Sequence, residues 1–426
     1  MSVQGATSPY YDPYDVDINA DPYPAYARLR EEAPVYHNER YDFWTLSRHE
    51  DVEKALLNWR TFSSTRSDIL DIIKAGVALP PGVMMFQDPP SHTKHRGLMA
   101  RVFTPRRMAE LEDQVRAFCI RCLDPLVGSG GFDIITELAS MMPMRVIGML
   151  LGIPEADQIA VRDKTDANLR TKPGKPMAVR EENIARGDVF SDYIEWRSKH
   201  PSDDLMTQLL EAELEDDSGV VRRLTRQEIL TYTAVIAGAG NETTGRLIGW
   251  LAKVLAEHPE QRREIAQDRS LILRVIDETL RFEPTGHATA RFVMEEVEYY
   301  GTTIPAGSPI LLLLASANRD PRRYAAPDVY DVHRDDIQHL TFGYGLHYCL
   351  GANLARLEGR IDSFELSSEL PWTNGLLERF RRDDDAACDT SPGAGDGMCD
   401  ACPITSGATS DDEMFVLRGT RLELPE

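Results

Sequence analysis

The chain has 426 residues, of which 42% are hydrophobic and 27% charged, ordinary proportions for a globular protein with a sizeable core. A formal net charge of −22 leaves no basic surplus to neutralise phosphates, which argues against a nucleic-acid partner and against docking on an acidic membrane surface. The N-terminus has no apolar segment long enough for a signal peptide or membrane anchor, and six cysteines do not make a disulfide framework. We therefore expect a cytoplasmic protein.

Helical patterns alternate with short strand-like segments in the first half of the chain. After a flexible N-terminus of residues 1–14, the sequence predicts helices at 21–32 and 48–58 and a strand at 43–46. The apolar, loop-like segment 61–90 is either a helix turn with core residues or a substrate-facing loop. Helical patterns then run over 91–152 and 154–215. Lys172-Pro-Gly-Lys-Pro176 interrupts the second stretch and indicates a surface loop between helices.

The clearest helix begins at Thr225-Arg-Gln-Glu228, which fits a capping box. Its apolar pattern continues to Leu255, and His258-Pro259 ends it after about 30 residues, or ~45 Å, enough to cross a whole domain. Further helices are predicted at 270–283 and 350–370, and strands at 297–300 and 309–314.

The C-terminal region has an unusual composition. Residues 383–413 contain nine acidic side chains and no Lys or Arg, so they cannot bury enough apolar surface to fold alone, and we expect a disordered insertion. Cys388, Cys399 and Cys402 lie in it. Cys399-x-x-Cys402 could indicate a metal site, but three thiols without a fourth ligand favour incidental cysteines. Cys119-x-x-Cys122 falls in a helical pattern and is interpreted as core or surface filler.

The strongest chemical signal is Phe342-Gly-Tyr-Gly-Leu-His-Tyr-Cys-Leu-Gly351. Its glycines, Gly343, Gly345 and Gly351, allow positive φ angles and let the backbone approach a flat ligand. Cys349 stands just before a predicted helix, whose N–H groups and dipole stabilise a thiolate, and His347 can donate to a carboxylate. The alternative is a buried structural cysteine in a glycine-rich turn. The whole pattern, however, resembles the heme-binding loop of the cytochrome P450 family.

A second motif, Ala239-Gly-Asn-Glu-Thr-Thr244, occupies the middle of the long helix. Glycine, an acid and hydroxyls are poor choices for a buried helix centre, so the alternatives are a kinked helix with a solvated polar patch and a functional site. In the functional interpretation Gly240 permits a distortion that opens a groove for dioxygen. Thr243 then holds a water or the bound peroxide, and Glu242 relays protons. The motif resembles the family's acid–alcohol pair.

Two further motifs agree in order and spacing. Glu278 and Arg281 lie at i and i+3 on one helical face, and the resemblance implies a buried structural ion pair that supports the heme loop. His92 and Arg96, at i and i+4, and Arg291 match residues that bind the heme propionates in the family. Each alone would more often be a surface group. With His347 they supply cations for two partly buried carboxylates; His95 and His339 lie nearby in the motifs.

The resemblance covers about residues 15–370, returns at 415–425, and implies one large domain over 1–426, mainly α with small β-sheets, in the cytochrome P450 fold. It implies heme b (iron protoporphyrin IX), with Cys349 as the metal ligand. Residues assigned to the heme surface are Ala239, Gly240, Phe342, Gly343 and Gly351. By position, the substrate pocket consists of Val83, Met84, Val235, Ile236, Ala239, Pro284, Ala288 and Thr289.

The implied reaction inserts one oxygen atom of O₂ into a substrate, which the apolar pocket residues predict to be a hydrophobic small molecule. No flavin or nicotinamide fingerprint is present, so electrons are expected from a ferredoxin and its reductase, supplied by NAD(P)H. We expect a monomer, with ferredoxin docking near Arg101, Arg106, Arg107, Arg356 and Arg360. The alternatives are a peroxide-driven peroxygenase and a non-catalytic heme-thiolate binding protein; the Glu242–Thr243 pair counts against both.

Overall fold

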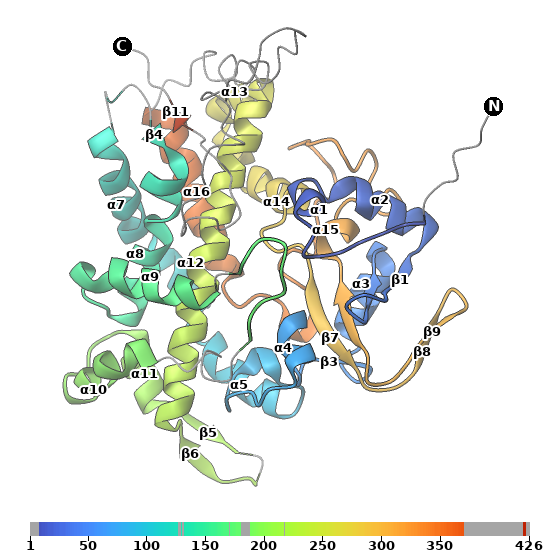
Figure 1. Ribbon diagram of the computed structural model, residues 1–426. Coiled ribbons are helices and arrows are strands. Elements are labelled where there is room, and N and C mark those ends of the chain that lie inside the picture. The colour runs from blue at the N-terminus through green and yellow to red at the C-terminus, as the bar shows by residue number, and fades with distance from the viewer. Residues whose placement is uncertain are drawn as a thin grey trace, which may run out of the picture.

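The computed structural model describes residues 8–126, 129, 132–169, 171–179, 188–216, 218–369 and 421–422. Helices dominate, and the strands form small sheets, as predicted from the sequence (Figure 1). Within these ranges, no helix has the length and apolar character needed to cross a bilayer.

The helices are α1 (Val16–Ala20), α2 (Tyr23–Glu32), α3 (His49–Leu57), α4 (Leu70–Ala75), α5 (Ser91–Ala100), α6 (Pro105–Glu110), α7 (Glu112–Leu123), α8 (Met142–Leu151), α9 (Gln158–Leu169), α10 (Ser191–Lys199), α11 (Leu205–Glu211), α12 (Arg226–Glu257), α13 (Pro259–Gln267), α14 (Ile272–Phe282), α15 (Leu314–Ala317) and α16 (Ala352–Glu369). Helices α2, α3, α12, α14 and α16 begin and end close to the predicted positions, whereas α1, α13 and α15 were not predicted. The segment 61–90 contains α4 and a short 3₁₀ turn at Met84–Phe86, and Leu70, Ile72 and Ile73 are buried, which agrees with the interpretation as a helix turn with core residues. The expected break at 172–176 is non-helical.

The main sheet has five strands in the order β1-β2-β10-β7-β3. Their bounds are β1 (Val35–Asn38), β2 (Phe43–Leu46), β3 (Phe62–Ser63), β7 (Thr289–Val293) and β10 (Pro309–Leu312). Strand β10 pairs parallel with β2 and antiparallel with β7, where Ile310 is opposite Arg291. A separate hairpin, β8 (Val297–Tyr299) with β9 (Thr302–Ile304), projects from this half of the molecule (Figure 1). The sheet therefore places Arg291 beside a fully buried strand centre.

The long helix α12 is the central element. Thr225 Oγ1 accepts a hydrogen bond from the backbone N–H of Glu228, and the Glu228 carboxylate accepts one from the N–H of Thr225, which confirms the predicted capping box. Burial alone would raise the pKa of Glu228, but Arg222 and Thr225 lower it to about 2. Figure 1 shows α12 running through the helical half of the molecule, where it packs against α8 and α16. Its centre is therefore held rigidly between two other helices.

The two ends of the chain compare differently with the sequence predictions. The predicted flexible N-terminus includes Tyr11 and Asp12, which are buried, so the packed fold begins before residue 14. At the other end, β11 (Arg421–Leu422) pairs with β4 (Phe132–Asp133), within the region predicted to resume the family pattern. The insertion at 383–413, with Cys388, Cys399 and Cys402, lies outside the described residues.

Candidate active site

The loop from Phe342 to Gly351 forms a tight turn in front of α16. The backbone N–H of Cys349 donates to the carbonyl of Phe342 at 2.7 Å. Gly343 and Gly345 both have a φ of +69°, the left-handed conformation that favours glycine. Gly351 is not among the positive-φ glycines, and a Cβ there would make only ordinary contact with the Cys349 sulfur. Positive φ is thus required at two of the three glycines expected to need it.

Opposing effects act on the Cys349 thiol. Burial raises its pKa, whereas the backbone N–H groups of Gly351 and Ala352 and the charges of Arg96 and Arg356 lower it; burial prevails. The N–H groups belong to the start of α16, as expected for a cysteine preceding a helix. A metal ion would add the remaining positive charge, since coordination deprotonates a thiol.

A basic cluster of four side chains, His92, Arg96, Arg291 and His347, converges from three elements. The His92 and His347 ring centroids are 4.4 Å apart. Within the described part of the chain, both ring nitrogens of His92 and Nε2 of His347 are buried without a hydrogen-bond partner. Arg291 is 5% exposed, and its Nη1 donates to the Ala290 carbonyl at 2.7 Å. These groups share one buried region.

The same cluster is electrostatically unfavourable by itself. Burial, together with the charges of Arg291, His92 and Arg96, lowers the pKa of His347 to about 3. Burial also lowers the pKa of Arg291, which Asp68 and Asp88 only partly offset. Buried cations need anionic partners. The cluster is therefore suited to an anionic ligand next to Cys349, and a pair of carboxylates such as the heme propionates fits it.

The centre of α12 presents an exposed patch between buried residues. Ala239 and Thr243 are exposed, although Asn241 and Thr244 beside them are buried. The Thr243 hydroxyl donates to the Ala239 carbonyl at 2.5 Å. Its oxygen therefore remains available as an acceptor on the exposed face.

Glu242 forms an i,i+4 ion pair with Arg246, which sequence analysis did not assign to the site. Arg246 Nη1 also donates to the carbonyl of Thr285 at 3.1 Å. Arg246 thus connects the expected proton relay to the segment between α14 and β7. The spacing of four residues along one helix was the signal that could have revealed it.

Gly240 has a clear packing function. A Cβ at this position would lie 2.6 Å from Cδ1 of Ile147 on α8. The absent side chain therefore allows α8 to approach α12 closely. Since α12 is one continuous helix from Arg226 to Glu257, close packing provides a reason for the glycine besides the expected distortion.

Glu278 and Arg281 form a fully buried bidentate ion pair with N–O distances of 2.7 and 2.8 Å. Arg281 also donates to the carbonyl of Asn318 at 3.0 Å. The Asn318 side chain in turn accepts from the N–H of Leu340 and donates to Thr341 Oγ1. The pair is thus connected through Asn318 to the segment that leads into the Cys349 loop.

The expected pocket residues differ in accessibility. Met84, Val235, Ile236, Ala288 and Thr289 are half-buried. Val83 is only 2% exposed and Pro284 is also buried, so both are packed by other side chains in this conformation.

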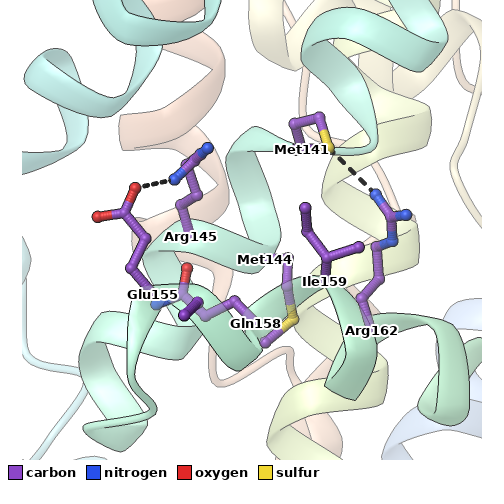
Figure 2. A pocket seen from close by; sticks show the side chains of 8 residues that line it. Met141, Met144, Arg145, Glu155, Gln158, Ile159 and Arg162 are labelled. Carbon is purple, nitrogen blue, oxygen red and sulfur yellow. Dashed lines mark hydrogen bonds and ion pairs between the residues drawn. The ribbon is translucent and has the colours of Figure 1, made fainter.

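A surface pocket of about 220 Å³ lies between α8 and α9 (Figure 2). Its lining residues are Met141, Met144, Arg145, Glu155, Ala156, Gln158, Ile159 and Arg162. Arg145 pairs with Glu155, and Arg162 lies 2.8 Å from Asp163. Because these charges are already paired and the lining includes no predicted site residue, we do not assign it to the active site.

The arginines expected to receive ferredoxin fall into two groups. Arg101, Arg106 and Arg107 are accessible to solvent. Arg356 instead bonds Asp277 at 2.8 Å, and Arg360 bonds Glu112 at 2.6 Å. Arg106 and Arg107 are also near acidic groups, Glu110 at 3.2 Å and Asp203 at 4.0 Å, but they are more exposed than Arg356 and Arg360.

A cysteine that precedes a helix and adjoins a basic cluster is the arrangement expected of a heme-thiolate protein. Residues 180–361 match the family model described as cytochrome P450. The chain is 38% identical over 355 residues to the putative cytochrome P450 123 of Mycobacterium tuberculosis, covering 82% of this chain and 87% of that protein.

It is 37% identical over 358 residues to the vitamin D(3) 25-hydroxylase of Pseudonocardia autotrophica, with coverage of 82% and 87%. The cytochrome P450 PksS of the Bacillus subtilis 168 bacillaene polyketide synthase matches with a TM-score of 0.76 and 29% identity, over 85% of this chain and 92% of that one. The chain belongs to the cytochrome P450 family and has its fold. It is a P450 monooxygenase similar to bacterial members.

Proposed function

We propose that the protein binds heme b, with Cys349 as the iron ligand and the four-residue basic cluster as the partner of the two propionates. The observation that carries this proposal is the convergence of buried, unpartnered imidazole nitrogens and two arginines beside a helix-capped cysteine. When bound, the thiolate-ligated heme supplies the oxidising chemistry, including cleavage of the O–O bond. The polypeptide is proposed to hold the heme, to position the substrate and to deliver protons.

Glu242 and Thr243 are proposed to manage protons. Thr243 already directs its hydroxyl proton to the Ala239 carbonyl, so its oxygen can accept a hydrogen bond from a water or a reacting group. Glu242 can exchange protons with solvent when its ion pair with Arg246 opens, because both side chains are partly exposed. Arg246 would then act as a positioning residue for this carboxylate.

The proposed reaction is hydroxylation of a hydrophobic small molecule, with electrons from an external ferredoxin and its reductase. Support for the substrate class comes from the half-buried apolar residues Met84, Val235, Ile236 and Ala288. A similar protein is named as a vitamin D(3) hydroxylase, and its substrate class is hydrophobic. We further propose a cytoplasmic monomer.

The decisive experiment compares the purified protein with Cys349→Ser by carbon monoxide difference spectroscopy. The parent should show the long-wavelength band of thiolate-ligated iron. The variant should lose it while the far-ultraviolet circular dichroism stays unchanged. Absence of the band in the parent would contradict the proposal. Absorbance titration with a library of hydrophobic compounds would then identify the substrate class from shifts of the heme band.

A further inference from the structure

Asp277 on α14 contacts Arg356 on α16 and His339, which precedes the cysteine loop. Its Oδ1 accepts a hydrogen bond of 2.8 Å from Nε of Arg356 on α16 and lies 3.5 Å from Nε2 of His339. The N–H of Thr341 donates to Nδ1 of His339, so a neutral His339 carries its proton on the nitrogen that faces Asp277. Burial opposes the charge on Asp277, but His339 and Arg356 outweigh it and lower the pKa of the carboxyl.

The other face of Arg356 is directed toward the cysteine loop. Its guanidinium carbon lies 4.7 Å from the ring centroid of Phe342, a cation–π contact, and its Nη1 donates to the Tyr348 hydroxyl at 3.3 Å. The Phe342 carbonyl accepts the N–H of Cys349. Arg356 thus contacts both the residue before Cys349 and the residue whose carbonyl accepts the Cys349 N–H. It is therefore a packing partner of the loop and brings a positive charge next to it.

An arginine side chain has several rotatable bonds, and only its partners keep it in one conformation. Of the two hydrogen-bond partners of Arg356, Tyr348 is an exposed loop residue. Asp277 belongs to helix α14 and therefore holds the guanidinium more firmly. Both members of the ion pair are about a quarter exposed, which makes their interaction stronger than that of a fully solvated pair.

We propose that Asp277 is a positioning residue for the cysteine thiolate: it holds Arg356 flat against Phe342, and its negative charge limits the positive potential that Arg356 exerts on Cys349. This inference rests on Cys349 being the iron ligand proposed above. It assigns to Arg356 a tuning function in place of the docking function expected from the sequence.

Substitutions of the two partners should shift the reduction potential of the iron in opposite directions. Asp277→Asn keeps the Oδ1 acceptor that holds the Nε of Arg356 in place but removes a negative charge, which favours the more electron-rich reduced state and raises the reduction potential. Arg356→Met removes a positive charge and lowers the potential. Each change is expected to alter the ratio of reduced to oxidised iron by about tenfold, equivalent to about 59 mV for a one-electron couple. The double variant should return to within about twofold of the parent ratio.

The test is a spectroelectrochemical titration of the purified holoprotein and its variants, with the carbon monoxide spectrum recorded for each. Asp277→Glu keeps the charge and should stay near the parent. Asp163→Asn is a matched control, because Asp163 forms an ion pair of 2.8 Å with Arg162 on α9, an element outside the Asp277–Arg356–loop contacts. It should leave the potential unchanged.

Shifts of the same sign in Asp277→Asn and Arg356→Met, or no shift in either while the thiolate band remains, would overturn the inference. In both cases Cys349 would remain the proposed iron ligand, because that assignment depends only on the thiolate band in the carbon monoxide spectrum. Loss of the band in the unmodified protein would instead overturn the ligand assignment and this inference with it.

Discussion

Replacing Glu278 with Gln removes the negative charge that pairs with Arg281 and also with Arg334, whose Nε lies 3.2 Å from Glu278 Oε1. Glu278 and Arg281 are both 0% exposed, and every guanidinium nitrogen of Arg281 donates a hydrogen bond in this region. Removing one charge leaves the other buried without compensation, which costs 3–5 kcal/mol for comparable pairs, roughly. Because Gln retains an acceptor oxygen, we expect about 3 kcal/mol, a large share of the roughly 5–15 kcal/mol that stabilises a domain.

The matched control is Glu31→Gln, since Glu31 also binds an arginine, Arg322, in a bidentate manner at 2.9 Å, but on the surface. An exposed pair of this kind contributes at most about 1 kcal/mol. Urea unfolding monitored by circular dichroism should show a midpoint about 1 M lower for Glu278→Gln, taking a slope of about 3 kcal/mol per molar. A decrease no larger than that of Glu31→Gln would refute the reasoning.

The remaining predictions concern packing, pH and electron transfer. Gly240→Ala should lower the free energy of unfolding by about 1–3 kcal/mol through overpacking. In an Ile147→Ala background the same substitution should cost less, because the clashing side chain is gone. If urea unfolding shows the same cost of Gly240→Ala in both backgrounds, the packing explanation is wrong. Burial, aided by Arg246 and Arg319, lowers the pKa of His287 to about 4. The unfolded chain takes up this proton near pH 6.5, roughly, so the free energy of unfolding should fall as pH drops from about 6.5 to about 4. His287→Gln should flatten that slope; an identical slope would contradict the assignment. Replacing the solvent-accessible Arg101, Arg106 and Arg107 with Glu should slow reduction by ferredoxin without altering the carbon monoxide spectrum. Unchanged reduction rates would exclude this docking face. Equal turnover with hydrogen peroxide alone would favour the peroxygenase alternative.

Local sequence determined the features that depend on neighbouring residues. The capping box at Thr225 and the proline after His258 define α12, because helix ends are set by side chains within one turn. Gly343 and Gly345 take the positive φ expected from their spacing near Cys349, since only glycine adopts it without strain. The family pattern was likewise readable from short motifs.

Tertiary structure alone decided which distant groups meet those motifs. Arg281 reaches the carbonyl of Asn318, 37 residues away, and Ile147 of α8 explains the small residue at Gly240. Asp277 stands directly before the recognised Glu278, yet only packing shows that it bonds Arg356, 79 residues later. Periodicity specifies the face of a helix on which a side chain lies, but the partner comes from another segment whose approach depends on the packing of the whole core.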